Sequence, residues 1–296
     1  QRHVAALGKD ALAGAPLETL FERAVELVAD TLDSEYAKVL EYRPGQEDLL
    51  LRAGVGWRDG LVGEATVGTD ENSQAGHTIR SEHPIVVEDL RTEERFRGPP
   101  LLVEHDVVSG ISVVIGSPDE PWGVLGTHTT EYTSFTDDDI TFVQNVANVL
   151  ATAIERRDHE RERVATIEFL QTLYDVATDR ELPTDDKISR LLELGPEKLG
   201  LPYGHLTRIE RPGDGGDGTQ TIIEASGNHD LLQPGDSCPL SQSYCRKTIE
   251  HDGLLEIQDA LAAGWAADPA FRTFDLGCYI GTRITVNDEL NKLATN

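Results

Sequence analysis

The chain has 296 residues but no methionine, only three cysteines, only six lysines and no long apolar run. No stretch approaches the roughly 18 apolar residues that a membrane-spanning helix requires, so we expect no membrane partner. The cysteine count is odd and no two cysteines form a CxxC pair, which argues against a disulfide scaffold and a zinc site. Apolar residues still make up 39% of the chain, as is typical of a globular protein with room for two domains.

Positive charge is also scarce. The sequence has 53 acidic residues against 26 Lys and Arg, and its formal net charge is −27. Such a surface repels nucleic acid, so we expect no direct nucleic-acid contact. The composition is typical of a cytoplasmic protein from a halophile, because about 1 M salt shortens the screening length to about 3 Å and weakens self-repulsion. An acidic docking surface is the alternative.

The motifs of several enzyme classes are absent. The sequence has no HExxH, no GxSxG and no GxxxxGK[ST], and its nine histidines stand apart from one another. Ser-His-Asp chemistry needs a positioned trio of side chains, and a metal site needs ligands at matched spacing. We therefore predict no catalytic residues and no metal ligands, so that this chain is not an enzyme by itself.

The first half has a regular order of apolar patterns. The spacing predicts helices at 17–33 and 72–82, strands at 36–44, 48–57, 84–90, 110–116 and 122–130, and a long helix over 137–179. Thr136 is the expected N-cap of that helix, and Asp137 to Asp139 fall in its first turn, where the helix dipole favours acids. At 1.5 Å per residue the helix is about 60 Å long. Helices of this length usually pair with a second copy, so we expect a homodimer.

The second half repeats the first at an offset of about 170 residues. Ser73, Thr78, Ile79, Val87 and Asp89 align with Ser243, Thr248, Ile249, Ile257 and Asp259. The strand near 281 aligns with that near 110 at an offset close to 171, so that Gly110 falls on Gly281. A repeat of this length with the same order of elements predicts two copies of one domain.

The segment 121–157, "PWGVLGTHTTEYTSFTDDDITFVQNVANVLATAIERR", resembles the closing strand and helix of GAF domains. The stretch "AVELVADTLDSEYAKVLEY" is similar to the opening helix and first strand of that family. The resemblance implies an α+β fold in which a roughly six-stranded antiparallel sheet is flanked by helices, with a concave cup that binds a small ligand. We expect two such domains, at 1–157 and, more divergent, at 168–290, joined by the helix 137–179.

The chain also resembles haloarchaeal sensor proteins, which implies a cytoplasmic sensory module. A small ligand in a cup would act through the linker helices on an output domain beyond residue 296, expected to be a histidine kinase. A helix-turn-helix transcription regulator is the alternative output. A third possibility is a dimerisation module that binds no ligand. A methionine sulfoxide reductase of the GAF type would need a catalytic trio from Cys238, Cys245 and Cys278, whose spacing differs from that family.

The resemblance places candidate ligand contacts in each cup, with ordinary packing as the alternative. In the first domain they are Trp57, His77, Val87, His105, Ser112 and Val114. In the second they are Tyr244, Cys245, Trp265, Cys278 and Tyr279. Cys245 is a candidate bilin or redox cysteine, or a buried small hydrophobe. The bilin and cyclic-nucleotide motifs of the family are absent, so the sequence identifies no cofactor.

The end of the chain is unusual. After "DEL" at 288–290 the second copy lacks the strand and closing helix that follow in the first copy. A GAF domain without them would expose a sheet edge and an apolar face. We therefore predict that about 30–45 residues are missing between Leu290 and Asn291, and that 291–296 begin the output linker.

Overall fold

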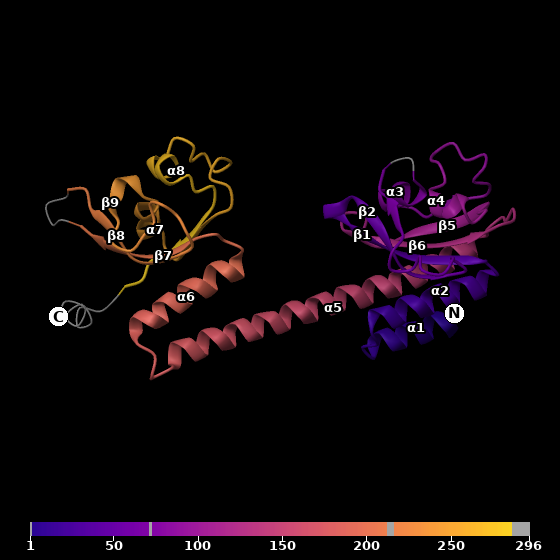
Figure 1. Cartoon of the computed structure of the whole chain (residues 1–296), viewed down its shortest axis with the longest axis horizontal. Coiled ribbons are helices and arrows are strands. Elements are labelled where there is room, and N and C mark those ends of the chain that lie inside the picture. Colours follow the sequence, from indigo (N-terminus) through magenta and orange to yellow (C-terminus); the bar gives the residue numbers. More distant parts are fainter. Residues whose placement is uncertain (1, 71–72, 212–215, 286–296) are drawn as a thin grey trace. The chain divides into compact units, whose positions relative to one another are not determined.

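The computed structural model describes residues 2–70, 73–211 and 216–285. The chain divides into two compact units, residues 1–164 (unit 1) and residues 165–296 (unit 2), and the helix α5 (Asp137–Thr178) runs through the boundary. Figure 1 shows the elements of both units. The expected long helix is confirmed, since α5 has 42 residues.

Unit 1 is built on one sheet. Within the described residues six strands pair in the order β3-β2-β1-β6-β5-β4, every pair antiparallel. Their bounds are β1 (Tyr36–Arg43), β2 (Asp48–Val55), β3 (Thr66–Gly68), β4 (Ile85–Val87), β5 (Ser109–Gly116) and β6 (Pro121–Thr129). The predicted six-stranded antiparallel sheet with flanking helices is therefore confirmed for this unit. The short strand β3 and the helices α1 (Arg2–Leu12) and α4 (Pro100–Val103) were not predicted from the sequence.

One face of the sheet packs against long helices. Figure 1 shows α1, α2 (Leu17–Leu32) and the first part of α5 on this side. Because side chains alternate along a strand, Val39, Val113 and Leu125 all point to this face, where they are buried with Phe21 and Leu150 of the helices. Burying each such side chain contributes about 1.5–3 kcal/mol, so this layer is the main core of the unit.

The other face, which we call the cup, lies beneath two short helices. Leu40, Leu51 and Val124 point into it, and Leu102 of α4 and Ile79 of α3 (Gln74–Ile79) pack against them. The strand between β1 and β5 is β6, so the centre of the cup is formed by residues of these three strands. Two chemically different faces therefore follow from one alternating pattern.

Side-chain caps fix where the helices beside the sheet begin. Ser73 accepts a hydrogen bond from the Gly76 N–H at 2.8 Å and is the N-cap of α3. At the start of α5, the Thr136 hydroxyl accepts from the Asp139 N–H at 3.3 Å, and Asp139 accepts from the Thr136 N–H at 2.8 Å. This reciprocal pair is a capping box, which confirms Thr136 as the expected cap.

Unit 2 repeats the order of elements of unit 1. It contains α6 (Thr184–Leu199), β7 (Gly204–Glu210), β8 (Thr219–Ser226), β9 (Ser237–Pro239), α7 (Cys245–Glu250), β10 (Leu254–Ile257), α8 (Pro269–Phe274) and β11 (Tyr279–Thr282). As far as the structure describes the unit, these strands form two sheets, β7-β8-β9 and β10-β11, rather than one of six strands. The difference arises because no described strand stands where β6 joins β1 to β5 in unit 1. The helix α6 continues through Pro196 without a break.

Equivalent backbone hydrogen bonds support the repeat. Leu51 N–H donates to Ala65 O, and Ile222 N–H donates to Asp236 O, each at 2.9 Å. The Leu90 N–H donates to Val108 O, and the Ala260 N–H to Gly277 O, each at 2.7 Å. The two units therefore share local geometry as well as order.

The strand register corrects one part of the predicted alignment. Val87 pairs with Gly110 in unit 1, and Ile257, its counterpart, pairs with Tyr279 in unit 2. Gly110 therefore corresponds to Tyr279 and not to Gly281. The local sequence match was wrong by two residues because the segment that joins the paired strands differs in length between the units, which only the pairing reveals.

Two further predictions concerned a junction near the end of the chain and the absence of membrane-spanning helices. The proposed junction between Leu290 and Asn291 lies outside the described residues. None of the helices in the described ranges has both the length and the apolar character that crossing a bilayer requires.

Candidate functional site

Three strands bring a row of polar side chains into the cup of unit 1. In the register of the sheet, Lys38 of β1 stands opposite Gly126 of β6, and Gly126 stands opposite Ser112 of β5. Residues directly opposite one another share a face, and so do residues two apart on one strand. His128 of β6 therefore points into the same cup, beside the row.

Two glycines make room for these side chains. A Cβ placed on Gly126 would lie 3.2 Å from His128 Nε2, 3.3 Å from Ser112 Oγ and 3.3 Å from Lys38 Cε. The three polar side chains thus converge on a single point above Gly126. A Cβ on Gly110 would overlap His128 Nδ1, so the imidazole ring occupies the space left by that glycine. We call Lys38, Ser112 and His128 the polar cluster.

Lys38 is a buried cation. Its relative exposure is 1%, and no Asp or Glu of the described chain forms an ion pair with it. Desolvation by burial lowers the pKa of Lys38 from 10.5 to about 7. Its ammonium lies 5.6 Å from the centre of the Trp57 ring, a cation–π contact that offsets only part of the desolvation cost. The side chain is thus expensive to bury here.

His128 is buried and lacks partners. Its exposure is also 1%, and neither ring nitrogen has a hydrogen-bond partner among the described residues. Burial, and next the positive charge of Lys38, lower the pKa of His128 well below its usual value, so the ring is neutral near pH 7. A neutral imidazole presents one donor and one acceptor nitrogen. Buried polar atoms without partners are uncommon in native proteins and call for an explanation.

Aromatic side chains form the wall of this part of the cup. Trp57 donates its indole N–H to the Ala37 carbonyl at 2.7 Å, and its ring centre lies 4.8 Å from that of Tyr36 and 5.0 Å from that of His105. His105 is held on both sides: its Nδ1 lies 2.8 Å from Leu101 O, and its Nε2 accepts from the Arg58 N–H at 3.3 Å. The polar atoms of Trp57 and His105 thus have hydrogen-bond partners, whereas the ring nitrogens of His128 have none among the described residues.

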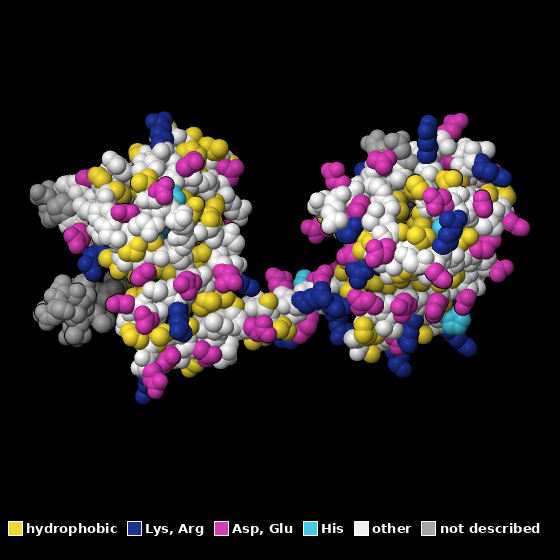
Figure 2. Space-filling view, viewed as in Figure 1, with side chains coloured by type: hydrophobic (Ala, Val, Ile, Leu, Met, Phe, Trp, Pro, Cys, Tyr) yellow, Lys and Arg dark blue, Asp and Glu magenta, His cyan; other side chains and the backbone are white. Residues whose placement is uncertain are grey.

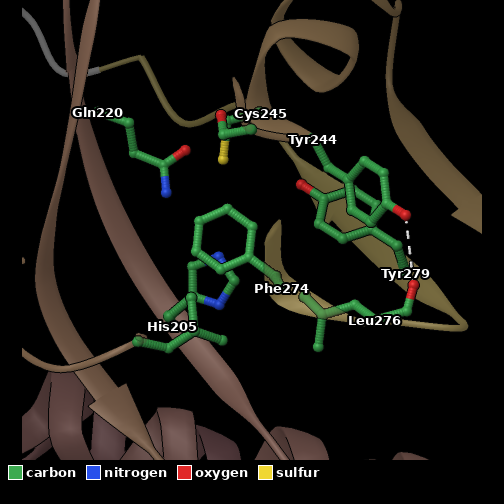
Figure 3. A pocket seen from close by; sticks show the side chains of 9 residues that line it. His205, Gln220, Tyr244, Cys245, Phe274, Leu276 and Tyr279 are labelled. Carbon is green, nitrogen blue, oxygen red and sulfur yellow. Dashed lines mark hydrogen bonds between the residues drawn. The ribbon is translucent and has the colours of Figure 1, made fainter. Parts of the chain in front are cut away.

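In unit 2 the corresponding space is a small cavity. Figure 3 shows His205, Gln220, Cys245 and Phe274 directed toward one centre, with Tyr244 and Tyr279 beside them. The cavity measures about 10 Å³, which is room for about one water molecule. The hydroxyl of Tyr279 is hydrogen-bonded to Thr248 at 2.7 Å, and Tyr279 stands where unit 1 has Gly110. A tyrosine at the glycine position thus contributes to filling this cup.

The chemistry of the small cavity is mostly that of neutral groups. Burial, followed by the nearby His229, lowers the pKa of His205. Burial also raises the pKa of Tyr279, as does the neighbouring Cys245. Cys245 itself is buried, and its Sγ lies 3.6 Å from the Thr207 hydroxyl. The cavity has no space for a bilin, so a role of Cys245 as a bilin carrier is not supported in this conformation.

Comparison with known protein families identifies the fold of unit 1. The family model described as "GAF domain" matches residues 16–154. These residues form a GAF domain. The match spans the strands that carry the polar cluster and the part of α5 that packs against the sheet.

Solved GAF domains have similar structures at low sequence identity. The GAF domain of a phosphoenolpyruvate-protein phosphotransferase from Coxiella burnetii is 20% identical with a TM-score of 0.49, and the alignment covers 55% of this chain and 95% of that one. The equivalent domain from Acinetobacter is 16% identical with a TM-score of 0.47, covering 54% and 96%. A phycocyanobilin-bound GAF domain from a cyanobacterial phytochrome is 18% identical with a TM-score of 0.45, covering 54% and 95%. No curated protein matches this chain.

The GAF domain places the six predicted ligand contacts in different surroundings. Trp57 and His105 lie together at the wall of the cup, and Ser112 belongs to the polar cluster. His77 lies apart from them, with its half-buried ring centre 5.3 Å from that of Phe96. Val87 is buried in a separate small cluster with Ile85 and the same Phe96. Val114, which pairs with Val124, is half-buried on the cup face of β5.

In unit 2, two of the five predicted contacts lie away from the cavity. Cys278 is exposed. It directly precedes Tyr279, and because consecutive strand residues face opposite sides, a tyrosine pointing inward leaves its neighbour pointing outward. Trp265 does not line the cavity; its ring packs against Tyr244 at 4.9 Å and beneath the Lys247 ammonium at 4.4 Å. Tyr244, Cys245 and Tyr279 do line it.

Metal binding finds no support in the described part of the chain, where no three His, Cys, Asp or Glu side chains are grouped as ligands. Neither Lys38 nor His128 is among the ligand contacts that the sequence predicted. A signal was present: "AKVLEY" places a lysine among apolar residues in a strand that is central to the sheet and so is covered on both faces. Its neighbours in the cluster, Ser112 and His128, belong to β5 and β6, and no local sequence pattern connects these strands to Lys38.

Proposed function

We propose that the GAF domain of unit 1 is the sensory part of a signal-transduction protein and binds a small ligand in its cup. GAF domains are sensory, ligand-binding modules of signalling proteins. The observation that carries the proposal for this chain lies in the polar cluster: both ring nitrogens of the buried His128 lack hydrogen-bond partners in the described chain, and the ring lies beside Lys38 and Ser112 in the cup. Such atoms cost free energy in the ligand-free protein, and a bound molecule would satisfy them.

The chain also offers a route from the cup to a helix. His128 lies near the end of β6, and only seven residues, 130–136, separate this strand from α5. Val143, Val146 and Leu150 of α5 pack on the opposite face of the same sheet. A ligand that shifts β6 would therefore bias the position of the helix, which is the kind of two-state element that transmission requires.

The output that we propose is a histidine kinase on the same chain, with a DNA-binding transcription regulator as the second candidate. The net charge of −27 disfavours contact between residues 1–296 and DNA. In the second candidate, the DNA-binding part would therefore be the output domain. An autophosphorylation assay of the full-length protein with and without ligand tests the first candidate. Absence of phosphotransfer together with specific DNA binding would favour the second.

We also propose that unit 2 is a second, divergent GAF domain. The repeated order of elements and the equivalent hydrogen bonds support this proposal. A glycine with a positive φ also stands at the same place in each unit. Gly56 has φ +82° and approaches Glu35 O, while Gly227 has φ +86° and approaches Pro202 O. The small cavity of unit 2 favours a structural role for this copy.

We propose that the chain acts by binding and not by catalysis. A methionine sulfoxide reductase would need the three cysteines in one cup, whereas Cys245 is buried, Cys238 is half-buried and Cys278 is exposed. Burial raises the pKa of Cys238, which disfavours the reactive thiolate. A turnover assay with free methionine sulfoxide tests this alternative, and sustained turnover would contradict the proposal.

Native mass spectrometry of the purified chain tests ligand binding. A retained small molecule that is lost in a Gly126→Trp variant, in which the indole would fill the cup, is the result expected for a sensor. A matched Gly45→Trp variant, at a glycine with no heavy atom within 4 Å of an added Cβ, is expected to keep the molecule. A strict dimer with no bound molecule, and no thermal stabilisation by a small-molecule panel, would instead support the pure dimerisation role.

A further inference from the structure

Each side chain of the polar cluster of unit 1 can donate a hydrogen bond. Lys38 contributes an ammonium, Ser112 a hydroxyl, and the neutral His128 one N–H. Gln74 adds a buried side-chain nitrogen without a partner among the described residues, at the start of the helix α3 that covers β5. No carboxylate of the described chain balances the charge of Lys38. Burial is the one cause of its lowered pKa, and a nearby carboxylate would have opposed that shift. The site is therefore complementary to an anion.

We propose that the cup of unit 1 binds a small monovalent carboxylate between Lys38, His128 and Ser112, an inference that rests on the proposed sensory function. The carboxylate oxygens accept hydrogen bonds from the three side chains above Gly126. Its negative charge compensates the buried ammonium, which no protein carboxylate does in the described chain.

The size of the site favours a carboxylate of few atoms. The three polar side chains approach the Cβ position of Gly126 to within 3.2–3.3 Å, so the cluster is compact. Leu40, Leu51 and Leu102 are buried in the same cup, so a short organic group beside the cluster would contact apolar side chains. Phosphate sites usually combine bidentate arginines or helix N-termini with more than one charge, and this cluster has a single cation.

Fluorescence of Trp57 reports directly on this site, because its ring centre is 5.6 Å from the Lys38 ammonium. The full chain with Trp122→Phe and Trp265→Phe keeps Trp57 as its single tryptophan. We would titrate it with sodium acetate and sodium pyruvate, with ionic strength held constant by sodium sulfate. A saturable change in emission is expected for at least one of the two. Acetamide, the neutral analogue of acetate, is expected to produce none.

Substitutions assign the binding to the cluster. Lys38→Met keeps the length of the side chain and removes its charge, and we expect it to weaken binding at least tenfold. Gly126→Ala keeps all three donors and places a methyl group where they converge, and we expect a loss of similar size. Lys247→Met, which removes the lysine that lies over Trp265 in unit 2, is the matched control and is expected to leave the affinity unchanged. Circular dichroism would establish that each variant is folded.

The possible results separate this inference from the sensory proposal. If acetamide binds as well as acetate, or if Lys38→Met leaves carboxylate affinity unchanged, the carboxylate class is wrong while sensing of another ligand stands. Equal binding of chloride would likewise overturn it, since the site would then hold an adventitious ion only. If no carboxylate binds and native mass spectrometry also finds no retained molecule, both proposals fail.

Discussion

Lys38 couples the stability of the GAF domain to pH. Its folded-state pKa of about 7 lies below the 10.5 of an exposed lysine. Between these values the unfolded chain binds more protons than the folded chain, so the free energy of unfolding rises with pH across this interval. Below pH 7 the full cost of burying the charged amine remains, about 5 kcal/mol for a shift of this size.

The first prediction therefore concerns Lys38→Met. At pH 6–7 the variant is expected to be more stable than the parent, and the difference is expected to shrink as pH approaches 10. Chemical denaturation in a Trp265→Phe background, where emission comes from Trp57 and Trp122 of unit 1, measures it. A stability difference that does not change with pH would contradict a folded-state pKa of about 7 for Lys38. Lys198→Met in unit 2 is the control.

Gly123 permits the close approach of β6 to β1. A Cβ at this position would overlap the Leu40 carbonyl oxygen, since Gly123 stands opposite Glu41. We expect Gly123→Ala to destabilise unit 1 by about 1–3 kcal/mol through overpacking. Gly45→Ala, where nothing lies within 4 Å of the added carbon, is the control and should change stability little. Equal unfolding midpoints for the two variants would show that the strands can separate without cost.

At the scale of elements, the capping box at the start of α5 stabilises the helix that leaves the sheet. Removing the hydroxyl of Thr136 leaves the Asp139 N–H without its acceptor. Thr136→Ala is expected to lower the free energy of unfolding by about 1 kcal/mol. Thr152→Ala, in the middle of the same helix, removes only a hydroxyl bonded to the Asn148 carbonyl and should be neutral or slightly stabilising. If both variants behave alike in thermal denaturation, the cap has no special role.

The part of α5 in unit 2 carries an apolar stripe. Ile167, Leu170 and Tyr174 are 52%, 56% and 65% exposed and follow one another at intervals of three and four residues. On the opposite side, Phe169, Leu173 and Val176 are half-buried. Spacing of three and four is typical of the seam of a coiled coil, so we propose that a second copy of this chain covers the stripe.

At the scale of the whole molecule, this stripe predicts the oligomeric state. The parent chain is expected to elute as a dimer in size-exclusion chromatography with light scattering. Leu170→Glu places a charge in the seam and should shift the chain toward monomer. Thr172→Glu, which adds the same charge at an exposed position on the side of the helix away from the stripe, should leave the dimer intact. A parent chain that is monomeric at tens of micromolar would contradict the proposed pairing.

The overall charge predicts a response to salt. Figure 2 shows acidic side chains spread over the visible face of both units rather than gathered in one patch. With a net charge of −27, screening should reduce self-repulsion as ionic strength rises. We expect the midpoint of thermal unfolding to rise by several degrees between 0.1 M and 2 M KCl. Sucrose, which stabilises without screening, is the control, and an unchanged midpoint in KCl would contradict adaptation to a salt-rich cytoplasm.

Local patterns in the sequence were enough to predict most of the secondary structure of the first domain and its family. Apolar residues at intervals of two and of three to four decide which faces are buried, and these patterns are local. They predicted the strands β1, β2, β4, β5 and β6 and the helices α2, α3 and α5. Two of the elements that escaped prediction, β3 and α4, have too few residues for a period to show, whereas α1 has 11 residues and was also missed.

The strand register and the composition of the site depend on contacts between distant segments, which the folded sheet alone reveals. Lys38, Ser112 and His128 stand in three strands as much as 90 residues apart along the chain, and strand pairing is what brings them above Gly126. The same pairing showed that Tyr279, and not Gly281, occupies the place of Gly110. A shift of two residues keeps the alternation of faces, so the sequence pattern cannot detect it; hydrogen-bonded partners differ, and these exist only in the folded sheet.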